Sequence, residues 1–426
     1  MDIRIEKPLC GGEIKAIASK PHSHRMLICA ALADDSTYIE CAETSGDTDA
    51  TVGCLKSLGA QISHDGKGFS VHPAKFPISE ELVTQVCGES GSTLRFMMPI
   101  CCALGVPADF KTLGRLRERP ASPLLEQLVA NGSVISMQKG NLQCSGKLSA
   151  GEFSLRGNIS SQFISGLLLA LPLLSGESVI NVEGRVDYMP YVTMTLDVLG
   201  AFGVAIKHRG SRAGRGAVFL VEGPQSYRSP GAIKVEGDWL NAACWLCAGA
   251  LGSGITCSGL NLGSRQGDMA IMRFLERFGA NVTYGGDSVT VAPGKLRGIQ
   301  IDASDAPDLV PLLAAVASVS KGETVISNVG KHKIKESDRL RATTETLRTL
   351  GADVSETQDG LVIKGKKNLR GGEVPSLGDH WIVSMAAIAS IVCENHVTIN
   401  AAEAAGRLYP GFFKDFEALG GKIAEM

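Results

Sequence analysis

The chain has 426 residues, of which 44% are apolar and 20% charged, so it can bury a large core and favours two domains over one. A net charge of −2 at pH 7 provides no general attraction to nucleic acid or to an anionic membrane surface. We therefore expect neither as a partner, and we expect any anionic ligand to be held by individually placed Lys and Arg side chains.

The N-terminal residues 1–8 have no apolar core behind their charges, so we expect no signal peptide, and the apolar segments are too short for a membrane-spanning helix. The longest of them, residues 164–174, is interrupted by Pro172. The twelve cysteines are scattered, and some lie in apolar runs, as Cys101 and Cys102 do, which is typical of buried side chains in a reducing compartment. The sequence predicts a cytoplasmic protein.

Two short spacings resemble metal or redox motifs, and both have a simpler interpretation. Cys244 and Cys247 have CxxC spacing, but they lie in an apolar helical run and no second CxxC completes a zinc site. His22 and His24 alternate along a predicted loop without a nearby acidic or cysteine partner. We expect core packing for the cysteines, a loop position for the histidines, and no metal ion.

A pattern of helix, glycine and strand recurs along the whole chain at intervals of about 70 residues. Glycine at these points fits a helix end that needs a left-handed residue, and the segments that follow alternate like half-buried strands. The six predicted helix ends are at Gly59, Gly132, Gly200, Gly279, Gly351 and Gly420.

A second helical run precedes each of these helix ends, and its composition is apolar on all sides, which predicts burial. The six runs are residues 26–33, 92–104, 161–174, 240–251, 308–318 and 381–392. Three such repeats would place helices inside and sheets outside in one α/β domain, and six repeats would form two domains. A crevice between the two halves is the expected ligand site.

Polar residues gather where the buried helices begin. Helix starts present free N–H groups and the positive end of a dipole, and Ser92, Ser160 and Ser161 add hydroxyl donors, so these starts predict an anion site. Capping alone would also explain the serines, but it requires neither Lys20 nor Arg25. We therefore expect a phosphorylated ligand.

Two cationic segments, residues 115–119 and 331–339, add to this prediction. In the second segment, Ser337 is a candidate cap for a helix that runs to Leu350, whose buried face includes Leu340 and Leu347. A solvated, charged helix start would explain this segment equally well on its own.

These residues, taken in order, resemble the 5-enolpyruvylshikimate-3-phosphate synthase family of enolpyruvyl transferases. The matching motifs run along essentially the whole chain, and the ordered set is far more specific than any member. They are Ser19-Lys20, Ser23-His24-Arg25, Ser90-Gly91-Ser92-Thr93, Arg117-Glu118-Arg119-Pro120, Ser160-Ser161-Gln162, residues 235–238, Lys335-Glu336-Ser337-Asp338-Arg339 and Asp379-His380.

The resemblance implies a two-domain inside-out α/β barrel built from the six repeats, with the active site in the interdomain cleft. One domain would comprise residues 1–18 plus 236–426, and the inserted domain residues 19–235. The domains would close over shikimate 3-phosphate and phosphoenolpyruvate and exclude water. The family also implies a monomer that needs no metal ion or organic cofactor.

The implied reaction transfers the enolpyruvyl group of phosphoenolpyruvate to the 5-hydroxyl of shikimate 3-phosphate, a step of chorismate and aromatic amino acid biosynthesis. Protonation of the methylene carbon lets the hydroxyl attack, and a tetrahedral intermediate then loses phosphate. Of the implied catalytic residues, Asp308 would bond the 5-hydroxyl, Glu336 would lie near the methylene carbon, and Lys20 would assist proton transfer.

The family's pattern also implies which residues bind the substrates. Arg339 would meet the phosphoenolpyruvate carboxylate with a bidentate fork. Shikimate 3-phosphate would be held by Lys20, Arg25, Ser160, Ser161, Gln162, Tyr191, Asp308 and Lys335. Phosphoenolpyruvate would be held by Lys20, Gly91, Arg119, Gln162, Arg339 and Arg407.

Several positions depart from the family's pattern. Trp381 stands where the family has Arg, and its indole has one N–H and no charge. Arg407 replaces Lys, and Pro21, Glu89 and Tyr188 replace Ser, Asn and Ser. These departures leave two alternatives open: a divergent paralogue with another acceptor, and a non-catalytic sensor of phosphorylated metabolites. The related cell-wall transferase uses a loop Cys, which residues 111–120 lack.

Overall fold

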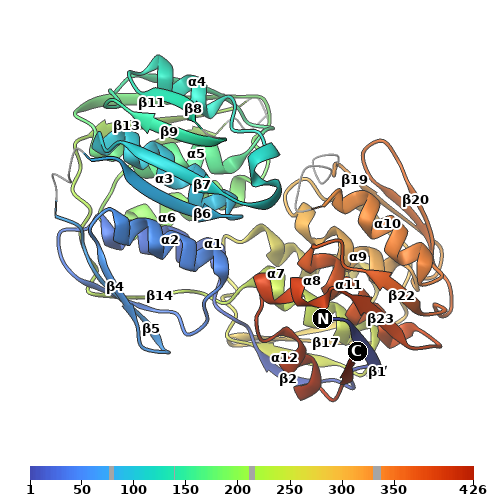
Figure 1. The fold of residues 1–426 in the computed structure, drawn as a ribbon. Helices are drawn as coiled ribbons and strands as arrows, with labels where there is room; N and C mark the ends of the chain where they lie inside the picture. Colours follow the sequence, from blue (N-terminus) through green and yellow to red (C-terminus); the bar gives the residue numbers. More distant parts are fainter. Residues whose placement is uncertain (76–80, 139, 211–215, 330–336) are drawn as a thin grey trace. The chain divides into compact units, whose positions relative to one another are not determined.

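The computed structural model describes residues 1–75, 81–138, 140–210, 216–329 and 337–426. The chain divides into two compact units (Figure 1). Unit 1 consists of Met1–Ile17 and Glu236–Met426, and unit 2 of Ala18–Val235. Within the described ranges, no helix combines the length and the apolar character needed to cross a membrane.

The described strands form six four-stranded sheets, three in each unit. In every sheet a parallel pair at one side is followed by two antiparallel pairings. The sheets of unit 2 are β14(Ala232–Lys234)-β3(Thr37–Glu40)-β5(Gly68–His72)-β4(Gln61–His64), β6(Val83–Gly88)-β7(Ala108–Thr112)-β9(Asn141–Ser145)-β8(Val134–Gln138) and β10(Glu152–Arg156)-β11(Gly176–Glu183)-β13(Gly216–Gly223)-β12(Lys207–Gly210).

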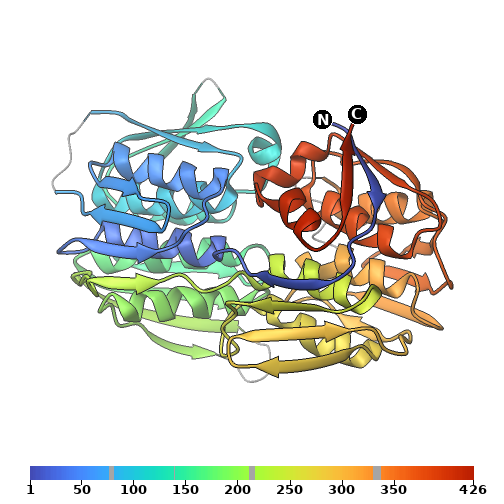
Figure 2. The same ribbon diagram turned by 90° about the horizontal axis from the view of Figure 1, so that it is seen from below.

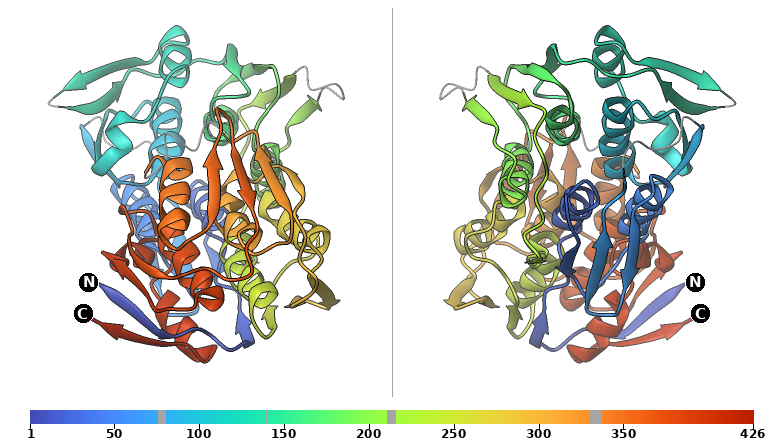
Figure 3. Two further views of the ribbon diagram at one scale, coloured as in Figure 1. Left: turned by 90° about the vertical axis from the view of Figure 1, so that its right-hand side faces the viewer. Right: turned by 90° about the vertical axis from the view of Figure 1, so that its left-hand side faces the viewer.

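Two of the three sheets of unit 1 combine an N-terminal strand with strands from later in the chain. The N-terminal strand β1 pairs with β23 and β24, and β2 pairs with β15. The termini lie side by side (Figures 2 and 3), and the Met426 N–H donates to the Asp2 carbonyl at 3.0 Å. These sheets are β22(Gly372–Pro375)-β23(Val397–Asn400)-β1(Ile3–Lys7)-β24(Lys422–Glu425), β16(Asn281–Gly285)-β17(Ser288–Ala292)-β15(Ile255–Ser258)-β2(Gly12–Lys15) and β18(Gln300–Asp302)-β19(Glu323–Ser327)-β21(Leu361–Lys364)-β20(Asp353–Glu356).

Largely buried helices form the core of each unit. In unit 2, α3 packs against α5 and α5 against α6, and in unit 1, α7, α9 and α11 contact one another. The helices of unit 2 are α1(Lys20–Ala31), α2(Gly46–Ser57), α3(Gly91–Leu104), α4(Leu124–Ala130), α5(Ser161–Ala170) and α6(Met189–Ala201), with short turns η1(Gly114–Glu118) and η2(Leu171–Leu173). Those of unit 1 are α7(Trp239–Leu251), α8(Ala270–Phe278), α9(Val310–Ala317), α10(Arg339–Thr349), α11(His380–Ala389) and α12(Phe412–Ala418), with η3(Gly267–Met269), η4(Pro307–Leu309), η6(Ser390–Val392) and η7(Ala402–Arg407).

The predicted core position of the CxxC cysteines is confirmed. Cys244 and Cys247 lie in α7 and are 2% and 0% exposed, and burial raises the pKa of both thiols. The predicted loop for His22 and His24 is wrong, because both lie in α1. Pro21 is compatible with the first turn of this helix, where a missing N–H costs no hydrogen bond.

Five of the six predicted helix ends are confirmed, and Gly200 is the exception. Gly59, for example, has φ +97° and follows α2. Gly200 instead lies inside α6, which continues to Ala201 because Phe202 is buried against the core. The left-handed residue after this helix is Gly203, with φ +76°. The other confirmed positions are Gly132, Gly279, Gly351 and Gly420.

Candidate functional site

Two buried helices of unit 2, α3 and α5, begin with serine caps that satisfy only part of the first turn. Ser90 Oγ accepts from the Thr93 N–H at 3.2 Å, and Ser160 Oγ accepts from the Gln162 N–H at 3.3 Å. Ser161, the first residue of α5, is buried. Helix starts of this kind retain donors for an anion.

Lys20, in the first turn of α1, forms an ion pair with a neighbouring helix. Its Nζ lies 2.7 Å from Asp47 Oδ2, and the two side chains are 24% and 22% exposed. The Thr93 hydroxyl donates to the Asp47 carbonyl at 3.3 Å. These bonds connect the starts of α1, α2 and α3, so the ammonium is held in place and still reaches solvent.

A second group joins α3, α5 and the segment after η1. Arg95 Nη1 donates to Gln162 Oε1 at 2.6 Å, and Gln162 Nε2 donates to Ser92 Oγ at 2.9 Å. Gly91 adjoins the same group, because a Cβ built there would lie 3.0 Å from Arg95 Nη1, 3.6 Å from Arg119 Nη1 and 3.7 Å from Gln162 Oε1. The structure therefore brings the predicted residues Gly91, Arg119 and Gln162 together.

Arg25 is 3% exposed and bonds mainly within unit 2. Its Nε donates to Thr195 Oγ1 at 2.7 Å, Nη1 to the Pro21 carbonyl at 2.7 Å, and Nη2 to the Tyr191 carbonyl at 3.1 Å. Nη2 also lies 3.4 Å from Ser165 Oγ, and the guanidinium covers the ring of Phe96. Burial lowers the pKa of Arg25 to about 10. Most of the five N–H donors of Arg25 therefore bond to acceptors within unit 2.

His24 is fully buried and begins a chain of hydroxyl groups across three helices. Its Nδ1 lies 2.7 Å from Thr51 Oγ1, Thr51 Oγ1 lies 2.7 Å from Thr93 Oγ1, and Thr93 Oγ1 lies 2.8 Å from Ser90 Oγ. Burial lowers the pKa of this imidazole to about 3, so it is neutral at physiological pH.

In unit 1 a buried arginine binds two carboxylates. Arg339 Nη1 lies 2.6 Å from Asp308 Oδ1 and Nε lies 2.9 Å from Asp379 Oδ2, with Arg339 2% and Asp379 0% exposed. Asp308 remains 20% exposed. The Ser337 hydroxyl donates to Asp379 Oδ2 at 2.9 Å, so Ser337 does not cap α10 as predicted. Asp338 is that cap, because its carboxylate accepts from the Arg341 N–H.

Trp381 does not present its indole to solvent. The side chain is 3% exposed, belongs to the apolar core of unit 1, and has its ring 5.2 Å from that of His380. Its backbone N–H donates to Asp379 Oδ1 at 3.0 Å, which caps α11. At this position the side chain therefore serves core packing and brings no charge.

The remaining predicted residues divide into described and undescribed positions. Tyr191 lies in α6, with its ring 6.3 Å from that of Tyr188. Arg407 is exposed at the end of η7, which contacts α11. Lys335 and Glu336 lie outside the described residues.

Three residues at these helix starts were absent from the predicted site: Asp47, Arg95 and Asp379. Asp47 follows Ser45, which forms a capping box with Thr48, so this helix start could have been found from the sequence. The sequence indicates the Asp379-His380 pair only as part of a motif. No local pattern identifies Arg95, because its partners are 67 and 25 residues away in the chain.

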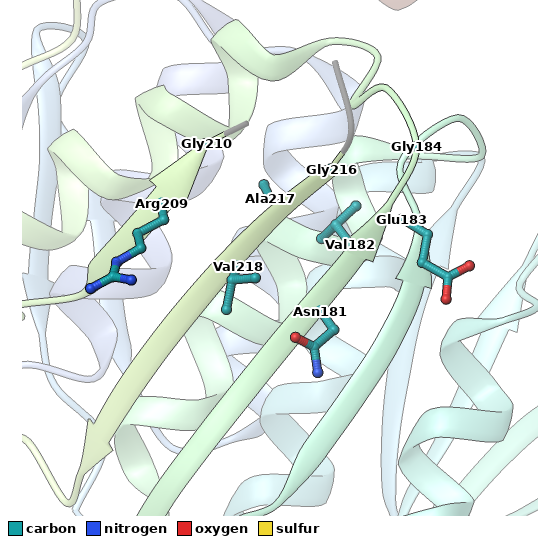
Figure 4. A pocket seen from close by; sticks show the side chains of 9 residues that line it. All are labelled: Asn181, Val182, Glu183, Gly184, Arg209, Gly210, Gly216, Ala217 and Val218. Carbon is teal, nitrogen blue, oxygen red and sulfur yellow. The ribbon is translucent and has the colours of Figure 1, made fainter. Parts of the chain in front are cut away.

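A shallow pocket of about 430 Å³ lies along strands of unit 2 (Figure 4). None of the predicted site residues lines it. Across the described ranges, His, Cys, Asp and Glu form no group of three or more suited to a metal ion. The pocket is lined by Asn181, Val182, Glu183, Gly184, Arg209, Gly210, Gly216, Ala217 and Val218.

Comparisons with known proteins agree along the whole chain. The family model for EPSP synthase (3-phosphoshikimate 1-carboxyvinyltransferase) matches residues 4–416. A 3-phosphoshikimate 1-carboxyvinyltransferase of Clostridium kluyveri is 41% identical over 416 residues, covering 97% of this chain and 96% of the relative. One of Clostridium acetobutylicum is 41% identical over 424 residues, covering 98% and 97%.

Solved structures show the same fold. An EPSP synthase from Acinetobacter baumannii has a TM-score of 0.81 at 20% sequence identity, and the match covers all of both chains. The chain thus shares its fold with a protein of low sequence identity. The family match and the clostridial relatives show that the chain belongs to the EPSP synthase family.

Proposed function

We propose that this chain transfers the enolpyruvyl group of phosphoenolpyruvate to the 5-hydroxyl of shikimate 3-phosphate and releases phosphate. Membership of the family and relatives named 3-phosphoshikimate 1-carboxyvinyltransferase support this reaction. The observation that carries it is the pairing of cations with carboxylates at helix starts, Lys20 with Asp47 and Arg339 with Asp308. The reaction needs anion-binding groups and proton-transfer groups together.

The proposed architecture is an inside-out α/β barrel in each of two domains, residues 1–18 plus 236–426 and residues 19–235. The shared plan of the six described sheets and the buried helices support it. In this proposal residues of both domains serve one pair of substrates in a cytoplasmic monomer.

The proposed ligands follow the family's pattern. Arg25 could give shikimate 3-phosphate only a small part of its guanidinium, because most of its donors have acceptors in unit 2. The proposed shikimate 3-phosphate residues are Lys20, Arg25, Ser160, Ser161, Gln162, Tyr191, Asp308 and Lys335. For phosphoenolpyruvate they are Lys20, Gly91, Arg119, Gln162, Arg339 and Arg407.

Arg339 and Asp308 would exchange partners during the reaction. A phosphoenolpyruvate carboxylate that binds at Arg339 Nη1 competes with Asp308, which occupies that nitrogen at 2.6 Å. The displaced Asp308 carboxylate could then accept the proton of the attacking 5-hydroxyl. Asp379 would keep the guanidinium in place through Nε throughout. Binding of one substrate would thus prepare the base for the other.

Proton transfer at the methylene carbon is proposed for Lys20 and Glu336. Lys20 is positioned by Asp47, and a general acid or base typically contributes about 10²- to 10⁴-fold to a rate. Protonation gives the tetrahedral intermediate after hydroxyl attack, and removal of a proton from the new methyl group expels phosphate. The cations at the helix starts would stabilise the departing phosphate.

Phosphate release from the purified protein tests the proposal. We expect release only when phosphoenolpyruvate and shikimate 3-phosphate are both present, and a loss of at least about 10²-fold in Asp308→Ala. Because Trp381 supplies no charge, we expect a high KM for phosphoenolpyruvate. Absence of release over a wide phosphoenolpyruvate range, despite calorimetric binding of shikimate 3-phosphate, would favour a sensor or a paralogue with another cosubstrate.

A further inference from the structure

Arg95 lies between two residues proposed to bind phosphoenolpyruvate. Its Nη1 donates to Gln162 Oε1 at 2.6 Å and its Nη2 donates to the Pro120 carbonyl at 3.1 Å, next to Arg119. The guanidinium carbon lies 5.5 Å from the centroid of the Phe163 ring. One half-buried side chain on α3 therefore bonds to both α5 and the segment that carries Arg119.

The Gln162 amide has two ends of nearly equal size but opposite hydrogen-bonding character. A guanidinium has only donors, so the end that faces Arg95 must be the carbonyl oxygen. The amino group is thereby directed to Ser92, whose Oγ it reaches at 2.9 Å. Each amino group has two N–H bonds, and Ser92 keeps its own hydroxyl proton. The Gln162 amino group and the Ser92 hydroxyl thus offer N–H and O–H donors to an anion. If the Gln162 amide were reversed, it would present its carbonyl oxygen, which repels an anion.

We propose that Arg95 is a positioning residue, which fixes the Gln162 amide with its amino group available to the anionic substrate. The inference rests on the proposed function, because Gln162 must serve the substrates. The convergence of Arg95, Arg119 and Gln162 on Gly91 supports it, since these groups surround a point where no side chain intervenes. Arg95 acts on the substrate through Gln162 and holds the Arg119 segment through Pro120.

A double-mutant cycle tests this role. Arg95→Met keeps an unbranched stem over Phe163 and removes every N–H donor, and it is made in the parent and in Gln162→Ala. We expect it to lower kcat/KM for phosphoenolpyruvate by about tenfold to a hundredfold in the parent. In the Gln162→Ala background, the fold loss in kcat/KM caused by Arg95→Met should be at least about five times smaller, because the effects of residues that act as a unit are not additive.

Two further variants separate positioning from folding. Arg95→Lys keeps one donor for Gln162 Oε1 and should recover part of the loss. Gln162→Glu should keep the melting temperature, because it pairs with Arg95, yet lose activity because it has no amino group. Arg273→Met is the matched control, since Arg273 is exposed on α8 and its guanidinium covers the ring of the buried Phe274. It should leave kcat/KM unchanged.

Equal losses in the two backgrounds would overturn the proposal, as would full activity of Gln162→Glu. If the parent releases no phosphate from the two substrates, the proposed function fails, and calorimetric binding of shikimate 3-phosphate replaces kcat/KM in the same cycle. Non-additive binding losses would then still support the positioning role. Additive losses, or no binding by the parent, would overturn it.

Discussion

The buried carboxylate of Asp379 accepts three hydrogen bonds. Oδ1 caps α11 through the Trp381 N–H, and Oδ2 accepts from Arg339 Nε and Ser337 Oγ. A charge with 0% exposure is stable only because these donors surround it. The side chain therefore affects both the stability of unit 1 and the position of the arginine proposed for phosphoenolpyruvate.

Asp379→Asn should lower the free energy of unfolding by about 3 kcal/mol, because it leaves the Arg339 charge without its most buried partner. Urea unfolding measures this loss. The control is Glu345→Gln, which breaks an exposed ion pair with Arg341, one helical turn away, at a 2.7 Å contact. That change should cost less than about 1 kcal/mol. Equal losses would contradict the role of burial.

His24 should make unfolding sensitive to acid. Its pKa is about 3 in the folded protein and 6.5 ordinarily, so between these values the unfolded chain binds the extra proton. Stability from this group is complete above pH 6.5 and falls as the pH is lowered, by at most about 1.4 kcal/mol per pH unit.

His24→Asn, which keeps an amide where Nδ1 contacts Thr51, should reduce the slope of unfolding free energy against pH in this window by about one proton. Urea unfolding at several pH values measures the slope. Thr51→Val is the control, since it removes the hydrogen-bond partner and keeps the histidine, and it should retain the slope. An unchanged slope in His24→Asn would show that another group dominates.

Site residues could be predicted where they coincide with helix starts. Ser160 and Asp308 lie at such starts as expected, because capping and dipole effects depend on local sequence. The role of Arg95 and the burial of Trp381 could not be predicted, because each depends on contacts between helices that are distant in the chain. Lys335 and Glu336 remain predictions.

At the scale of elements, the end of α6 shows the limit of a local pattern. The sequence offers two glycines, Gly200 and Gly203, and only tertiary packing selects between them. Burial of Phe202 extends the helix, so Gly203 takes the left-handed conformation. At the other five helix ends the predicted glycine itself follows the helix and has a positive φ.

Alanine substitutions at these two glycines should have opposite effects. Gly200→Ala should raise the free energy of unfolding by about 0.5–1 kcal/mol, because Gly200 is helical and a Cβ would meet nothing within 4 Å. Gly203→Ala should lower it by about 1–2 kcal/mol, because φ is +76° there. Chemical denaturation of both variants measures the difference. Equal effects would place the helix end elsewhere.

At the scale of the whole molecule, the two units have separate apolar cores. One core contains α7, α9 and α11 with β1, and the other contains α1, α3 and α5. The apolar all-round composition of these helices made their burial predictable. The pairing of β1 with strands from the far end of the chain was not predictable from local periodicity, which carries no information about register between distant segments.

Cavity-forming changes should act on one unit at a time. Leu168→Ala in α5 and Leu313→Ala in α9 each remove a fully buried side chain and should cost about 2–5 kcal/mol. Hydrogen exchange in mild denaturant, read by mass spectrometry, should show faster exchange in unit 2 for the first variant and in unit 1 for the second. Faster exchange throughout the chain in both variants would indicate one cooperative structure.

The position of β1 between β23 and β24 has a consequence for synthesis on the ribosome. Ile3 pairs with Ile399 and Glu425, so the strand made first has to wait until nearly the whole chain has emerged. Unit 2, residues 18–235, is continuous and can fold in the meantime. At roughly 5–20 residues per second, this wait lasts tens of seconds, during which β1 stays unpaired and its core side chains, Ile3 and Ile5, are open to chaperones. During translation, unit 2 can therefore fold before unit 1.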